Sequence, residues 1–121
     1  MDTLEQRQDQ RIGVFVEAKY RKEDSVYTPY CPGEIVDIHH LGCRLLGPVV
    51  CERGEVVSIQ VDLLPEGAFD LEGVVAWSAP VVRDHVYETG VRFLTEDRTA
   101  EEMYLRLFHY CLINRRNAKV S

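Results

Sequence analysis

Two arginines four residues apart, Arg7 and Arg11, end a polar N-terminal segment, and the chain turns apolar and β-branched from Ile12. A guanidinium group is planar, permanently charged and forked, so it can donate paired hydrogen bonds to phosphate oxygens or to the O6 and N7 atoms of guanine. Arginines at this spacing also occur on ordinary solvated helical turns, so the pair alone does not define a site. On an arm at the edge of a folded domain, the pair would suit an anionic ligand.

A second polar group, Asp37-Ile38-His39-His40-Leu41-Gly42, lies where a predicted strand ends. Asp37 and His39 are two residues apart, so both project from the same side of a strand. A carboxylate can accept hydrogen bonds from the N1–H and N2–H₂ edge of guanine, which arginine cannot do. Gly42 permits a tight turn with close approach of the backbone to a ligand. The arginines and this turn therefore complement each other as a guanine-nucleotide site.

The elements that must position these residues are mostly strands. Residues 55–64 give the clearest pattern, because Val57, Ile59 and Val61 alternate with polar residues. Leu71, Gly73, Val75 and Trp77 are expected to share one face of another strand, which Pro80 ends. Residues 27–33 contain two prolines and a glycine and are predicted to form a loop or an edge segment. In all, strands are predicted at 12–20, 34–38, 43–46, 55–64, 71–77 and 87–94.

The end of the chain has helical rather than strand periodicity. Thr99 and Glu102 fit a capping box at its start. One amphipathic stripe contains Ala100, Met103, Tyr104, Leu107, Phe108, Cys111 and Leu112. We therefore predict a mostly β chain that closes into a six-stranded antiparallel barrel, which removes sheet edges, with a C-terminal helix packed on the barrel. The predicted parts of this single domain are a flexible arm (1–11), the barrel (12–95) and the helix (96–117).

Composition limits the classes of function. The chain has 121 residues and a formal net charge of −6, which fits one domain and argues against a broad nucleic-acid or anionic-membrane surface. No apolar run approaches the ~20 residues of a membrane span. The start of the chain is polar and carries no signal peptide, and the four cysteines form no C-x-x-C pair. These features predict a cytoplasmic protein with reduced thiols.

Other chemistry finds less support in the sequence. His39, His40 and Cys43 could suggest a metal site, but neighbouring residues of a strand point to opposite faces and no recognised ligand spacing is present. Asp37 with His39 is the nearest approach to a catalytic pair, and nothing places Ser78 or another nucleophile beside it. No hydrolase, metalloprotease or P-loop motif occurs. We expect neither a metal nor an enzymatic activity.

Taken together, these motifs resemble the PilZ domain family. That family carries R-x-x-x-R before its first strand and [DN]-x-S-x-x-G at the turn between its second and third strands. This chain has Arg7-x-x-x-Arg11 and Asp37-x-His39-x-x-Gly42 at those places. Further matches are the segments Gly73-Val74-Val75-Ala76-Trp77 and Gly90-Val91-Arg92-Phe93.

The resemblance implies a split barrel that binds the bacterial second messenger cyclic di-GMP. Arg7 and Arg11 would contact phosphate and guanine, Asp37 would bond a guanine edge, and Gly42 would shape the turn. His39 replaces the family serine. A protonated imidazole could attract phosphate or stack on guanine, whereas a neutral one could crowd the pocket.

Three functions follow from these observations. The first is a receptor without catalysis, in which cyclic di-GMP folds the arm onto the barrel and switches a surface for a downstream protein. The second is an adaptor that binds no nucleotide and acts through protein contacts in motility or pilus machinery, which His39 favours. The third is a small oligonucleotide-binding barrel, against which the acidic charge argues. The favoured prediction is a monomer or homodimer that needs no cofactor, binds no DNA or RNA and does not insert into membranes.

Overall fold

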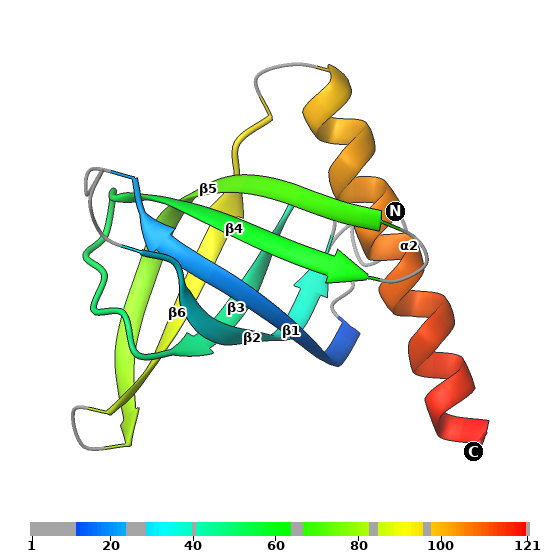
Figure 1. The fold of residues 1–121 in the computed structure, drawn as a ribbon, viewed down its shortest axis with the longest axis horizontal. Helices are drawn as coiled ribbons and strands as arrows, with labels where there is room; N and C mark the ends of the chain where they lie inside the picture. Colours follow the sequence, from blue (N-terminus) through cyan, green and yellow to red (C-terminus); the bar gives the residue numbers. More distant parts are fainter. Residues whose placement is uncertain are drawn as a thin grey trace, which may run out of the picture.

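The computed structural model describes residues 12–23, 29–39, 41–63, 67–82, 85–95 and 98–120, with helix side chains described as far as Ile113. Six strands and one helix form within these residues, and the strands close into an antiparallel barrel in the order β1-β2-β3-β6-β5-β4 (Figure 1). The predicted fold class is confirmed. The element bounds are β1 Ile12–Lys22, β2 Cys31–His39, β3 Gly42–Gly47, β4 Val56–Leu63, β5 Gly67–Val82, β6 Val86–Phe93 and α2 Arg98–Val120.

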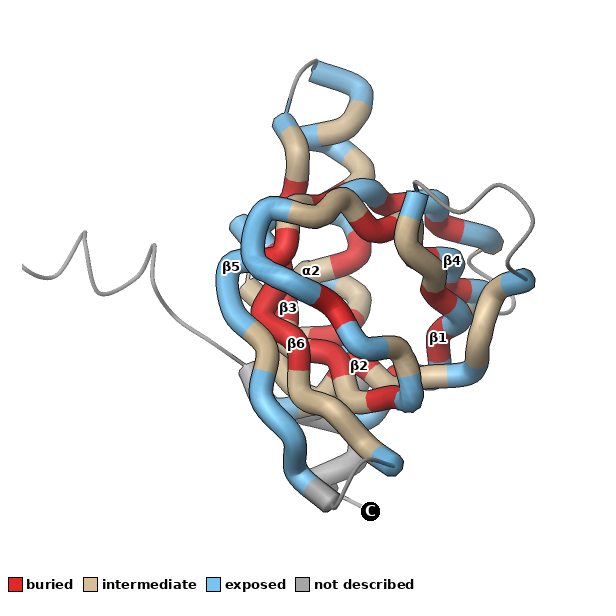
Figure 2. Tube along the Cα trace, turned by 90° about the vertical axis from the view of Figure 1, so that its left-hand side faces the viewer, coloured by how far each residue is buried: buried red, intermediate tan, exposed pale blue. Residues whose placement is uncertain are grey.

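The barrel interior is built from residues that alternate along the strands. In β4, Val57, Ile59 and Val61 are buried, whereas Gln60 and Asp62 are exposed. Alternation of this kind places one apolar face in the core and one polar face in water. Figure 2 shows the same pattern around the barrel, with the buried segments gathered toward its inside.

Helix α2 packs on the barrel with the predicted apolar stripe. Tyr104, Leu107 and Cys111 are buried, and the other four residues of the stripe pack half-buried against the same core. The Tyr104 ring stacks on Phe93 with centroids 4.4 Å apart. Its hydroxyl donates to the backbone oxygens of Glu72 and Leu94. The helix is thereby tied to the backbone of β5 and to the residue that follows β6.

Helix α2 differs from the prediction at its start. It begins at Arg98, so Thr99 lies inside the first turn rather than at the predicted capping position. Among the residues that the structure describes, no helix is long and apolar enough to cross a membrane.

Two strands are longer than their prolines suggested. β2 begins at Cys31. Residues 31–33 pair with β1, whereas the ladder with β3 starts only at Glu34, so the last part of the predicted loop or edge segment over 27–33 is an edge segment. β5 continues past Pro80 to Val82, with a register irregularity between these two residues. A bulge accommodates a residue that lacks a ladder N–H, which explains why the strand does not end there.

A second irregularity reverses the orientation predicted for Trp77. The register of β5 against β6 shifts between Val75 and Trp77. Val75 is 1% exposed, as expected for the core, but Trp77 is 40% exposed. One extra residue in a strand turns the following side chain to the other face. The prediction that Trp77 shares one face of the strand with Val75 is therefore wrong.

Tyr20 of β1 is the largest side chain that is buried completely. Its ring lies so close to Gly33 and Gly47 that a Cβ at either position would collide with it. Its hydroxyl oxygen accepts a hydrogen bond from the Val49 N–H at 3.1 Å. Burial is the main reason that the pKa of Tyr20 rises to about 12.

Candidate ligand-binding site

A hollow of about 210 Å³ opens on the barrel between the end of β2 and strands β3, β6 and β5. We call it the Asp37 pocket. It contains Asp37 and His39, two of the residues that the sequence predicted for the site. Its lining consists of Asp37, His39, Leu41, Cys43, Arg44, Ala76, Trp77, Gly90, Val91 and Arg92.

The Asp37 carboxylate is already paired with a cation. Arg44 Nη2 lies 3.3 Å from Asp37 Oδ2, and Arg44 Nη1 lies 2.9 Å from Glu88 Oε2. The side chain of Asp37 is 13% exposed and that of Glu88 is 25% exposed, so both pairs are partly shielded from solvent screening. One guanidinium thus bridges carboxylates from β2 and β6 at the pocket wall.

Arg44 is a site residue that the sequence reasoning missed. Its Nε is buried and has no hydrogen-bond partner among the described residues. The signal was present in the spacing: His39 and Gly42 pair at the hairpin end, and two steps further along each strand bring Asp37 opposite Arg44. Counting back from a two-residue turn would have placed the two side chains together.

His39 is oriented by the turn that follows it. Its Nδ1 accepts a hydrogen bond from the Leu41 N–H at 3.3 Å. An acceptor nitrogen carries no proton, so this contact belongs to the tautomer protonated at Nε2. The imidazole lies in the pocket lining as predicted, although its Nδ1 is engaged with the turn. His40 lies outside the described residues.

Gly42 meets a packing constraint in addition to the turn predicted for it. A Cβ at this position would collide with the backbone oxygen of Val91, which belongs to the neighbouring strand β6. The described glycines with positive φ are Gly54 and Gly67, so Gly42 does not supply a left-handed turn. It allows β3 and β6 to approach closely beneath the pocket.

Trp77 and Gly90 form another wall of the pocket. A Cβ on Gly90 would overlap the Trp77 indole around Nε1, so the ring lies directly over this glycine. The indole keeps 40% of its surface exposed while lining the hollow. An aromatic face that is supported from below and open above can stack on a planar base.

Cys43 lies in the pocket lining as a buried thiol rather than as a reactive one. Burial, and to a smaller extent the charge of Asp37, raises the pKa of the Cys43 thiol well above its usual range. A protonated thiol is a poor nucleophile and a poor metal ligand. Among the residues described, no three His, Cys, Asp or Glu side chains group in a way that could hold a metal ion.

The predicted arginines Arg7 and Arg11 lie outside the described residues. The point where their segment joins the barrel is described. Strand β1 begins at Ile12 opposite Ile38, and Gly13 lies opposite Asp37. The segment that carries both arginines is therefore attached beside the strand that carries Asp37.

Comparison with protein families gives one match. A family model described as PilZ domain matches residues 5–110, a span that contains all six strands and more than half of helix α2. No curated protein matches the sequence at a significant level.

Several solved structures share the fold. The PilZ domain of YcgR from Escherichia coli, solved with c-di-GMP, is 16% identical, with a TM-score of 0.69 over 93% of this chain and 95% of that one. The PilZ domain of CeSA from a cellulose-synthesizing bacterium is 14% identical, with a TM-score of 0.65 over 84% of this chain and 96% of that one. The MrkH–c-di-GMP complex of K. pneumonia is 11% identical, with a TM-score of 0.68 over 92% of this chain and 54% of that one. At these identities the structures support a shared barrel.

Proposed function

This chain belongs to the PilZ domain family, and we propose that it is a receptor for cyclic di-GMP that holds the nucleotide between Arg7, Arg11 and the Asp37 pocket. The observation that carries the proposal is the pairing of Gly13 with Asp37. It attaches the arginine segment beside the carboxylate that would accept a guanine edge. The YcgR and MrkH structures with c-di-GMP support the same ligand class for a barrel of this shape.

The size of the pocket supports a two-sided site. Its volume of about 210 Å³ is below the roughly 300–1,000 Å³ typical of small-molecule pockets. The barrel would therefore cover one side of the nucleotide, and the arm would have to cover the other. Closure of the arm would change the surface presented to a downstream protein, which is how binding would be signalled.

Ligand binding would replace the Asp37–Arg44 ion pair with contacts from each of these residues to the nucleotide. A guanine edge would take over the Asp37 carboxylate, while Arg44 would keep its contact with Glu88 and turn its buried Nε and Nη2 toward a phosphate. Trp77 would stack on a base, and Arg92 would add a second positive charge to the lining. A ligand that offers both base donors and phosphate oxygens satisfies all four groups.

Titration calorimetry with cyclic di-GMP tests this function and gives the number of ligands per site. Arg11→Ala should weaken binding by about tenfold to a hundredfold, because a buried phosphate loses a charged donor. The matched control is Arg53→Ala, which removes an exposed arginine in the turn before β4. His39→Ser should keep or strengthen binding. Unchanged affinity in Arg11→Ala would count against this mode of binding.

An adaptor that binds no nucleotide is the second candidate. It is favoured by His39, which stands where the family has serine, and by the pairing of Asp37 with Arg44. In that case the Asp37–Arg44–Glu88 contacts would be structural, and calorimetry with the wild-type chain would register no binding heat. Such a result would replace the receptor with the adaptor.

A further inference from the structure

We propose that the outer face of β4, β1 and β2 is a docking groove for an extended segment of a partner protein that carries lysine or arginine at alternate positions. The groove is a hollow of about 1010 Å³. It shares no lining residue with the Asp37 pocket. The proposal therefore goes beyond nucleotide binding and does not depend on it. We call this surface the acidic groove.

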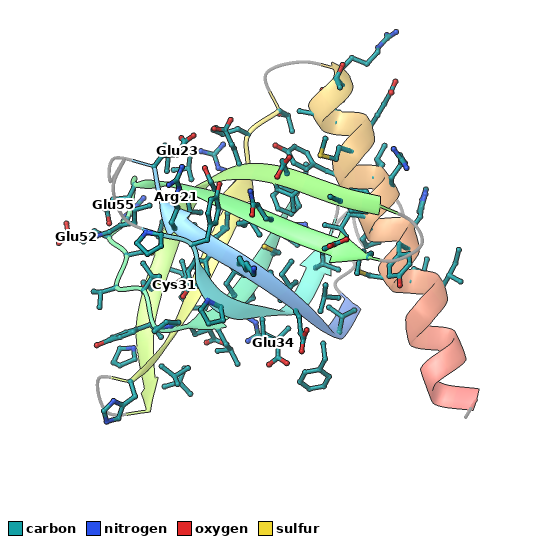
Figure 3. The ribbon with its side chains drawn as sticks, in the orientation of Figure 1. Arg21, Glu23, Cys31, Glu34, Glu52 and Glu55 are labelled. Carbon is teal, nitrogen blue, oxygen red and sulfur yellow. The ribbon has the colours of Figure 1, made fainter. Side chains whose placement is uncertain are left out.

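The acidic groove is lined by four carboxylates and one cation. Glu17 and Glu34 are direct cross-strand partners on β1 and β2, and Asp70 of β5 lies opposite a neutral glutamine. Figure 3 shows Glu34 projecting away from the interior of the barrel. The cation, Lys19, and the carboxylates form no ion pair with any described residue. Like charges placed directly opposite one another destabilise a sheet, so the Glu17–Glu34 pair lowers the stability of the folded chain.

The seam that closes the barrel between β1 and β4 is only partly paired at the same place. The ladder between β1 and β4 stops at the Lys19–Gln60 pair, although both strands continue. The second rung beyond it would set Glu17 against Asp62, and no such pair forms in the described part of the chain. Were the ladder to continue, these two like charges would lie directly opposite one another, which a sheet disfavours. Beyond this point the facing edges of β1 and β4 pair with no other described strand.

The floor of the groove is apolar. Ala18 and Val61, which would form the first missing rung, are buried yet line the hollow. An extended segment points successive side chains to opposite faces. Along the open edge, one set would meet these apolar residues and the other would meet the carboxylates outside. Unpaired strand edges accept such segments through main-chain hydrogen bonds.

The charge of the surface selects the occupant. Nucleic acid and anionic lipid would be repelled by the carboxylates. A second copy of this chain carries the same net charge of −6. Its alternate basic residues Lys19 and Arg21 lie in the part of β1 that is paired with β4, so they are not offered on a free edge. A separate protein with an alternating basic and apolar strand fits both the rim and the floor. Specificity would come from the alternation, because charge alone would attract any cationic peptide.

The probe for this proposal is the synthetic peptide Lys-Val-Lys-Thr-Lys-Val, titrated into the full-length ¹⁵N-labelled chain. We expect shifts of the amides along β1 and β4 that line the groove, with binding that weakens as salt rises. The double variant Glu17→Gln/Asp62→Asn should bind about fivefold to tenfold more weakly. It should remain folded, because it removes a repulsion. The control Glu101→Gln/Glu102→Gln changes the net charge equally on exposed helix positions and should leave binding unchanged.

A second probe is the same peptide with its alternate backbone amides methylated on the side that would pair with the strand edge. It keeps the charge and loses the main-chain donors, so we expect clearly weaker binding. Equal affinity of the two peptides, equal weakening in both double variants, no binding, or shifts away from β1 and β4 would each overturn the proposal. Glu17→Gln/Asp62→Asn should keep its affinity for cyclic di-GMP. Failure of nucleotide binding would therefore leave the docking groove standing, and the reverse also holds.

Discussion

The Asp37 pocket and the acidic groove lie on the outside of the same barrel, yet their charges are arranged in opposite ways. In the pocket, Arg44 stands between Asp37 and Glu88, so each carboxylate has a partner within the protein. In the groove, Glu17 faces Glu34 across a ladder with no cation between them. One face is compensated internally, and the other is left negative.

The difference teaches what each face can recognise. A ligand can separate the Asp37–Arg44 ion pair only if it replaces both partners. A guanine nucleotide can do so, because it offers hydrogen-bond donors to Asp37 and an anionic phosphate to Arg44. A surface with unpaired carboxylates attracts cations over a longer range, so its specificity must come from the shape of the groove. The pocket is therefore suited to one small molecule, and the groove to a protein segment.

The largest expected effect tests how rigidly the pocket face is held. Gly42→Ala forces a methyl group into the Val91 backbone oxygen, and we expect a loss of about 3 kcal/mol in unfolding free energy, because a strand cannot move aside as a side chain can. The control is Gly13→Ala, where an added Cβ meets nothing within 4 Å. Urea denaturation measures both. Similar stability of the two variants would mean that β3 and β6 can separate without cost.

The next prediction compares the cations of the two faces. Arg44→Met leaves the partly buried carboxylates of Asp37 and Glu88 without their partner and should cost about 2 kcal/mol. Lys19→Met removes a cation that forms no ion pair with the described residues and should cost less than about 0.5 kcal/mol. Urea denaturation at low salt separates them. If the two costs were equal, the contrast between a compensated and an uncompensated face would fail.

Beneath the acidic groove, the neutral Tyr20 ring supplies a pH-dependent contribution. Its pKa is about 12 in the folded chain and ~10 when unfolded. The stability from burying the neutral phenol is complete below pH 10 and is lost as the pH rises through 12. Tyr20→Phe should cost about 1 kcal/mol at pH 7, since Val49 N–H loses its acceptor. It should also flatten the alkaline decline in urea midpoints between pH 10 and 12. An unchanged decline would assign it to other groups.

A thiol on helix α2 also contributes to the loss of stability at alkaline pH. Burial raises the pKa of the Cys111 thiol on helix α2 to about 11. Its contribution is also lost as the pH rises, so the Tyr20→Phe variant should flatten the decline without abolishing it.

The sequence predicted burial correctly where the hydrophobic periodicity of a single segment determines which side chains face the core. The alternation at Val57, Ile59 and Val61 and the helical stripe at Tyr104 and Leu107 placed these residues correctly in the core. Each pattern needs only its own segment to be recognised. Closure of the barrel followed from the number of strands and the need to remove their edges.

The errors arose where a partner strand decided the outcome. Trp77 faces outward because the ladder with β6 shifts at that point, and β5 continues past Pro80 because β6 still pairs with it. The packing constraint at Gly42, which no prediction contained, comes from the Val91 oxygen of β6. These contacts join segments far apart in sequence, so no local pattern reveals them.

For the candidate site, the sequence placed two residues in one lining and omitted a third. Asp37 and His39 both line the pocket, as their spacing on one strand indicated. Arg44 could have been found from the hairpin register, yet its bridge to Glu88 depends on β6. The roles of Arg7 and Arg11 stay predictions for the binding experiment.

The smallest expected effect is a gain in stability on the negative face. Glu17→Gln removes one of two facing carboxylates and should raise the unfolding free energy by about 0.5 kcal/mol at low salt. Screening should reduce this gain as the Debye length falls from ~30 Å at 0.01 M salt to ~10 Å at 0.1 M. The matched control, Glu102→Gln on the exposed side of helix α2, should change stability very little. Paired urea titrations at the two salt concentrations measure the difference.

The sign of that change decides between two explanations of the groove. A gain with Glu17→Gln, together with weaker peptide binding, means that the chain keeps a locally unfavourable charge because a partner uses it, as functional sites often do. A loss of stability would mean that Glu17 has a favourable contact within the folded chain. The acidic face would then be compensated like the pocket, and the reason to expect a basic partner there would disappear.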